Sequence, residues 1–212
     1  MPKQKEDGKH GESPEKQHFE LERLPELVRK FSREKIEDYA VPDAGQNIIL
    51  PPLIYNPTKD FVRARDESRG VMLASTVESG GKQYWLVEYM QMLGQGNSVS
   101  VFPSPAKRNA LIAMLGENEK DMKVIEYHSH TVSTGDVWFD QFSSGDYKTI
   151  QGMLNVNPDY IHALFTPTHV LTLAHQETTL KLARSSNEAN ALSRKKFLKW
   201  QGLFNGFLQQ SQ

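Results

Sequence analysis

Two histidines with the spacing of a metal-binding pair, His128 and His130, stand at the end of the apolar run MKVIEYHSH. If this run is a strand, both side chains leave the same face of the sheet, because side-chain directions alternate along a strand. Two imidazoles on one face can reach a single ion at about 2.0–2.1 Å. By itself such a pair is weak evidence for a metal. The remaining histidines do not occur in such a pair and are interpreted as structural or surface residues: His10, His18, His162, His169 and His175.

A carboxylate near the pair would complete a site, since zinc in hydrolases commonly has three protein ligands and leaves the fourth position for water. Two stretches contain a suitable aspartate, in each case three residues after a serine: Ser133-x-x-Asp136 and Ser143-x-x-Asp146. Each also has a local interpretation, the first as a turn and the second as a helix cap. Asp146 is the preferred ligand because a helical pattern follows it, whereas VWFDQF follows Asp136. A ligand in the first turn of a helix is held rigidly.

The pattern from His128 to Asp146 resembles the signature H-x-H-x7-S-x-x-D of the JAMM (MPN-plus) zinc metalloproteases. That family also has a glutamate upstream, commonly in a Glu-x-x-Gly context just before an apolar strand. Here Glu67 stands in ESRG, immediately before the run VMLAST. The resemblance covers about residues 57 to 173, and it implies a mixed α/β fold of the α+β type. In that fold an MPN-like sheet is flanked by helices.

Two departures from the family pattern concern the loop after the second histidine. Twelve residues, 131 to 142, separate His130 from Ser143 where the family has seven, and Thr131 replaces the usual proline. Lengthening a surface loop costs little entropy, so the departures mark a divergent member rather than exclude a metal. The loop carries apolar groups that could line a substrate site or fold over the core: Trp138, Phe139 and Phe142.

The resemblance implies a role for each residue of the pattern. His128, His130 and Asp146 would hold one Zn²⁺ per chain, with water in the fourth position. Glu67 would act as the general base, a contribution of about 10²–10⁴-fold. Ser143 would hydrogen-bond the developing oxyanion, which is worth roughly 2.7–4 kcal/mol.

Glu78 and Glu88 are the alternatives to Glu67 as the base. Glu78 lies in an expected hairpin turn, and Glu88 lies in mid-strand with no glycine three residues on. Both positions fit a catalytic base less well than Glu67, although an ordinary solvated glutamate at a helix end is the competing interpretation of Glu67 itself.

By the same resemblance, the expected activity is that of a deubiquitinase-like peptidase. It would hydrolyse the isopeptide bond that attaches a ubiquitin-like protein, an amide bond at the C-terminus of such a protein, or an amide bond of a peptide. A small-molecule amide is also open, and the alternative function is that of a catalytically inactive MPN-type scaffold. The sequence YHSHTVSTGD also resembles the first motif of PHP-type phosphoesterases, but those need further ligands over some two hundred following residues. Only residues 131–212 follow His130 here. A relationship to the DNA-repair-associated RadC group is a further alternative. The sequence shows no nucleic-acid-binding pattern that would support it.

The helices and strands that position these residues are predicted from the periodicity of the apolar residues, and their ends from the positions of proline and glycine. Strands are expected from Val71, Tyr84, Ser98, Met122, Ile161 and His169, with a hairpin turn at Gly80-Gly81. Helices are expected over about 19–39, 57–68 with Asn56 as N-cap, 104–116, from Ser143, and from about Asn187. The expected division is a disordered tail (1–18), a helix and connector (19–56), a catalytic domain (57–185) and an amphipathic helix (186–212).

Composition narrows the classes of function. The 212 residues include no cysteine, which excludes disulfide frameworks, cysteine-rich zinc sites and thiol nucleophiles. A formal net charge of -1 gives no field that would attract nucleic acid or an anionic membrane. The first 18 residues lack the apolar segment of a secretory signal peptide. No run of apolar residues elsewhere is long enough to span a bilayer, so we expect a cytoplasmic protein. The terminal helices could serve a homo-oligomer or a partner protein, although stripes of this kind usually pack on their own core.

Overall fold

The computed structural model describes ten stretches of the chain. They are residues 28–32, 36–38, 46–62, 66–79, 82–96, 103–118, 122–131, 141–174, 178–184 and 187–211. The expected disordered tail, the expected strand at 98–102 and most of the loop after His130 therefore lie outside the described residues.

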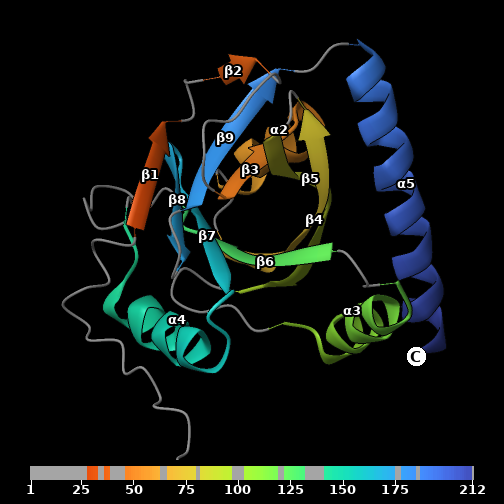
Figure 1. The fold of residues 1–212 in the computed structure, drawn as a ribbon. Coiled ribbons are helices and arrows are strands. Elements are labelled where there is room, and N and C mark those ends of the chain that lie inside the picture. The colour runs from red at the N-terminus through yellow and green to blue at the C-terminus, as the bar shows by residue number, and fades with distance from the viewer. Residues whose placement is uncertain are drawn as a thin grey trace, which may run out of the picture.

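The described residues form one mixed sheet flanked by helices (Figure 1). The strands are β1 (Val28–Ser32), β2 (Ile36–Asp38), β3 (Gln46–Leu50), β4 (Ser68–Ser79), β5 (Lys82–Gln95), β6 (Met122–Ser129), β7 (Ile161–Phe165), β8 (His169–Ala174) and β9 (Thr178–Arg184). The helices are α2 (Pro52–Phe61), α3 (Pro105–Asn118), α4 (Ser144–Val156) and α5 (Asn187–Gln210). The expected mixed α/β class is confirmed.

The strand order is β1-β8-β7-β6-β4-β5-β3-β9-β2. At its centre β4 pairs antiparallel with both β5 and β6, and β6 pairs parallel with β7. The β4–β5 pairing runs as far as Ser79↔Lys82, which confirms the expected hairpin; Gly80 and Gly81 themselves lie outside the described residues. The β6–β7 pair brings the end of β6, which holds His128 and is followed directly by His130, beside the end of β7.

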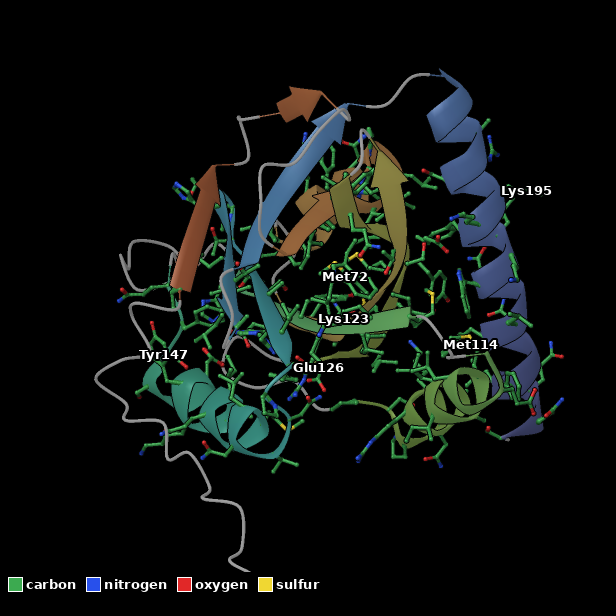
Figure 2. The ribbon with its side chains drawn as sticks, in the orientation of Figure 1. Met72, Met114, Lys123, Glu126, Tyr147 and Lys195 are labelled. Atoms are coloured by element: carbon green, nitrogen blue, oxygen red, sulfur yellow. The ribbon has the colours of Figure 1, made fainter. Side chains whose placement is uncertain are left out.

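The sheet curls, so that it has an inner and an outer face (Figure 1). Helix α2 closes the inner face, where Ile54 and Tyr55 pack with Met72, Tyr127 and Phe165. Helices α3 and α5 cover the outer face of β4 and β5, and α4 covers the outer face of β7 and β8. Figure 2 shows Met72 inside the curl and Met114 between α3 and α5. The bulk of the apolar burial that stabilises the fold lies in these layers.

The expected helix over 19–39 is wrong wherever its residues are described. Val28–Ser32 forms strand β1, which pairs antiparallel with β8 from Val28↔Leu173 to Ser32↔His169. Ile36–Asp38 forms β2, which is parallel to β9. An unpaired edge of β8 would leave a row of backbone donors and acceptors without partners. Pairing with that edge outweighs the helical spacing of the apolar residues.

The expected helix over 57–68 is also corrected, because α2 begins five residues earlier. Pro52 occupies the first turn, and Pro57 lies inside the helix. Pro52 fits the rule that favours proline at a helix start, whereas Pro57 lies in the helix interior, where it has no backbone N–H to donate. The earlier start buries Ile54 and Tyr55 in the inner core, and Ser68 already belongs to β4.

The connector and the region before the last helix hold strands that the sequence pattern did not predict. β3 pairs parallel with β5 and with β9. The other expected elements agree within a few residues, namely β4, β5, α3, β6, α4, β7, β8 and α5. Among the described helices, none is long and apolar enough to cross a membrane.

Candidate metal centre

Strand β6 delivers the two histidines to the outer face, at the edge of the area covered by α4. His128 and His130 are buried, with 7% and 6% of their surface exposed. The backbone N–H of His130 donates to the carbonyl oxygen of Phe165 at 2.9 Å, so the chain stays tied to β7 just beyond the strand end. The expected common face is confirmed, since the two Nε2 atoms lie 3.2 Å apart.

The first turn of α4 brings Asp146 to the same point. Ser143 is the N-cap, and its Oγ accepts a hydrogen bond from the Asp146 backbone N–H at 3.1 Å. In return Asp146 Oδ2 accepts from the Ser143 backbone N–H at 2.7 Å, which completes a capping box. The interpretation of Ser143-x-x-Asp146 as a helix cap is confirmed, and it is compatible with Asp146 as a ligand. The cap fixes the carboxylate in the position from which it faces the histidines.

The three candidate ligand side chains form a compact triangle, in which each histidine faces a different oxygen of the Asp146 carboxylate. His128 Nε2 lies 3.4 Å from Asp146 Oδ1, His130 Nε2 lies 3.6 Å from Asp146 Oδ2, and the two Nε2 atoms are 3.2 Å apart. Tetrahedral bonds of about 2.0–2.1 Å place neighbouring ligand atoms about 3.3–3.4 Å apart. Two nitrogens and a carboxylate oxygen also form a donor set common at such centres. The group His128, His130 and Asp146 thus has the geometry to hold a metal ion.

Glu67 stands immediately before β4 and is 9% exposed. Its carbonyl oxygen accepts from the Gly96 N–H at 3.0 Å, and the next residue, Ser68, donates its N–H to Ser129 Oγ at 2.9 Å. Burial raises the pKa of Glu67 to about 7; the charge of His130 opposes the shift and that of Asp146 adds to it. The carboxyl group is therefore buried within electrostatic reach of the triangle.

The glycine three residues after Glu67 has a packing reason. A Cβ on Gly70 would lie 2.0 Å from the Gln91 carbonyl oxygen and 2.7 Å from Tyr127 Oη. Neither distance is tolerable, so β5 and Tyr127 can approach this part of β4 only if residue 70 has no side chain. The Glu-x-x-Gly spacing thus fixes the segment that carries Glu67.

The other residues considered in the sequence analysis lie partly within the site, partly elsewhere in the fold and partly outside the described residues. Ser143 Oγ donates to Asp146 Oδ2 at 2.7 Å, so its hydrogen is engaged within the site. Glu88 lies elsewhere, on β5, bonded to Lys196 and to Trp200 Nε1 at 3.2 Å. Phe142 is buried, with its ring centroid 6.0 Å from that of His128, so it folds over the core. The side chain of Glu78 and the residues Asp136, Trp138 and Phe139 lie outside the described part of the chain.

Sequence reasoning missed His162, which it assigned to the structural or surface class. His162 is buried on β7, and its Nε2 lies 2.7 Å from Nδ1 of His128. Its own Nδ1 lies 2.9 Å from the hydroxyl of Tyr160. That hydroxyl donates to Glu126 Oε2 at 3.1 Å, and Arg69 Nη2 donates to the same oxygen at 3.0 Å. The available signal was the alternation Tyr160-x-His162, two polar groups on one face of a buried strand.

The electrostatics of the site favour neutral His128 and His162 side chains beside an ionised Asp146. Burial lowers the pKa of His128, and it lowers the pKa of His162 well below its usual range. Burial alone would raise the pKa of Asp146, but hydrogen bonds from His128 and His130 hold it far below its usual range. Neutral imidazole and ionised carboxylate are the protonation states that bind metal ions.

Comparisons with known proteins add little to this geometry. No protein-family model matches the chain, and no curated protein is similar to it in sequence. Among solved structures, one similar chain is the solution structure of protein DSY2949 from Desulfitobacterium hafniense. It is 14% identical over 66% of this chain and 96% of that chain, with a TM-score of 0.42.

Proposed function

We propose that the chain is a zinc-dependent amide hydrolase of the JAMM type, acting on an isopeptide or C-terminal bond of a ubiquitin-like protein. The observation that carries the proposal is the triangle of His128, His130 and Asp146, with the buried carboxyl group of Glu67 beside it. The order β4, β5, α3, β6, α4 matches the order implied by the sequence resemblance. It supports an MPN-like arrangement as part of the proposal.

His128, His130 and Asp146 would hold the ion in this proposal. A zinc ion would supply Lewis-acid activation of water at neutral pH and polarisation of the scissile carbonyl. The two imidazole nitrogens of the donor set fit zinc better than magnesium or calcium, which prefer oxygen ligands.

Glu67 would take the proton from the attacking water and deliver it to the leaving amine nitrogen. A base works best when its pKa lies near the working pH, and burial raises the pKa of Glu67 to about 7. The group can therefore accept and release a proton within one cycle near neutrality. An unperturbed glutamate would hold the proton too weakly to pass it on.

Ser143 would assist the carbonyl oxygen as negative charge develops on it. Its hydroxyl hydrogen points to Asp146 Oδ2 and can turn toward a substrate, because Ser143 is exposed. Phe142 packs over the ring of His128 and keeps water from that side of the pair. The substrate must then approach from the exposed start of α4.

The test is cleavage of ubiquitin-like conjugates by the zinc-loaded protein, with and without a chelator. Chelator-sensitive cleavage that is absent in the Glu67→Gln variant, at equal zinc content, is the expected result. A protein that binds zinc but cleaves none of the conjugates or peptide amides contradicts the proposed activity. That outcome favours the inactive scaffold.

A further inference from the structure

We infer that His162 is a positioning residue that sets the tautomer and ring orientation of His128. The inference rests on the proposed metal site but not on the proposed hydrolysis. Five residues make up what is called here the polar chain: His128, His162, Tyr160, Glu126 and Arg69. Each is joined to the next by one hydrogen bond of 2.7–3.1 Å.

The direction of every hydrogen bond in the polar chain follows from the first residue. A histidine that binds a metal through Nε2 carries its proton on Nδ1. His128 Nδ1–H must then donate to His162 Nε2, 2.7 Å away. A neutral His162 has its own proton on Nδ1 and donates to the Tyr160 hydroxyl, which donates in turn to Glu126 Oε2.

The far end of the polar chain is anchored by charge. Arg69 Nη2 lies 3.0 Å from Glu126 Oε2, and this ion pair fixes the carboxylate as an acceptor. Glu126 and Arg69 are half-buried, whereas His162 and Tyr160 are buried. Because Glu126 Oε2 accepts from both Tyr160 and Arg69, the hydrogen bonds run from the metal side outward. Figure 2 shows Glu126 on β6, on the side of the sheet toward α4.

The sheet holds the polar chain in register. Glu126 lies opposite His162 in the parallel β6–β7 pair, and Arg69 lies opposite His128 in the antiparallel β4–β6 pair. The ring of Phe142 packs against His128 and His162 at centroid distances of 6.0 and 6.1 Å. Backbone pairing and this apolar cover together hold Nδ1 of His128 against Nε2 of His162.

A metal-bound histidine usually donates its second N–H to a carboxylate, a carbonyl or water. Here a second histidine takes that place and passes the orientation on to a carboxylate two links away. Loss of such an outer partner typically weakens metal binding by about 10- to 100-fold. We expect a loss in this range when His162 is replaced by leucine.

The experiment measures the zinc dissociation constant by chelator competition for the full chain and four variants. His162→Leu should weaken binding about 10- to 100-fold. His162→Gln should restore much of it, because an amide oxygen can accept from His128 and the amide N–H can donate to Tyr160. Tyr160→Phe should fall between them. Ile161→Ala is the matched control: it removes buried volume from the opposite face of β7, and it should lower Tm without changing the zinc affinity.

Nitrogen-15 NMR of the zinc-loaded protein gives a second measurement that a purely structural role would not move. The wild-type protein and His162→Gln should show a protected Nδ1–H on His128, and His162→Leu should lose it. Zinc affinity that is equal in the wild type, His162→Leu and Tyr160→Phe would overturn the inference and leave the metal site standing. A wild-type protein that binds no zinc would overturn both. Zinc binding with the expected losses but no hydrolysis would overturn only the proposed activity.

Discussion

Asp146 Oδ2 accepts the backbone N–H of Ser143 at 2.7 Å, and Oδ1 of the same carboxylate lies 3.4 Å from His128 Nε2. One side chain thus begins helix α4 and closes the candidate metal site. The N-terminal end of a helix also favours negative charge, which helps to keep the carboxylate ionised where a ligand must be.

Replacing Asp146 should separate these two functions. Asp146→Ala should abolish zinc binding and also weaken the start of α4. Asp146→Asn should keep most of the helix start, because an amide oxygen can still accept the Ser143 N–H, while zinc binding falls steeply. Zinc content of the purified proteins and thermal unfolding measure the two effects. Asp136→Ala is the control and should keep its zinc; loss of zinc there, with Asp146→Ala unaffected, would reverse the choice of ligand.

Glu67→Gln should retain zinc and fold while hydrolysis falls by at least about 10²-fold, the lower end of the usual contribution of a general base. Gln91→Glu, on β5, is a control for a carboxyl–amide exchange away from the triangle and should leave zinc content unchanged. Initial rates at equal zinc content decide the result. Full activity of Glu67→Gln would remove Glu67 from the mechanism.

The raised pKa of Glu67 also has a consequence for the metal-free protein. Burial raises the pKa from 4.5 to about 7 in the folded state, so the folded protein binds this proton more tightly than the unfolded chain. The stability gained is present below about pH 4.5 and is lost as pH rises through about 7. Urea unfolding across that range should show a steeper loss for the wild type than for Glu67→Gln. Parallel curves would contradict a buried, proton-retaining Glu67.

The carboxylate of Glu88 should tie helix α5 to the sheet. It accepts hydrogen bonds from Ser75, Lys196 and Trp200. Burial alone would raise the pKa of Glu88, but these bonds hold it below its usual value. The stability it contributes is therefore present above the unfolded pKa and lost as pH falls through the folded pKa.

The Lys196→Met variant tests this tie, since it leaves Glu88 buried without its cation. We expect the free energy of unfolding to fall by roughly 1–3 kcal/mol, with zinc affinity unchanged. Lys195→Met is the matched control, because Lys195 projects from the outer side of α5 (Figure 2), and it should have little effect. Equal stability of the two variants in urea would show that the Glu88 cluster does not hold α5.

Gly70→Ala should destabilise the fold by about 1–3 kcal/mol or more, as expected for overpacking, and should disturb the segment that carries Glu67. The added Cβ would clash with the Gln91 carbonyl oxygen and with Tyr127. Gly116→Ala is the control, because a Cβ there meets no atom within 4 Å and alanine favours a helix. Thermal unfolding compares the two. Equal Tm values would mean that β4 and β5 can separate at no cost.

The sequence predicted the centre of the site because its residues lie on elements with strong local signals. Apolar runs marked β6 and β7, and the Ser143-x-x-Asp146 cap marked the start of α4. His162 was missed because the β6–β7 register brings it to its partners. Local sequence patterns do not predict the register between two strands that are far apart in the chain. Strands β1 and β2 were missed for a similar reason: their backbone pairing with β8 and β9 is a tertiary effect that overrides local periodicity.

The central claim is that His128, His130 and Asp146 bind one zinc ion, and anomalous diffraction at the zinc edge tests it most directly. We expect one peak per chain, bonded to Nε2 of both histidines and to the Asp146 carboxylate at about 2.0–2.2 Å. A zinc peak held by Asp136 in place of Asp146, or no peak within the triangle in zinc-loaded crystals, would contradict it.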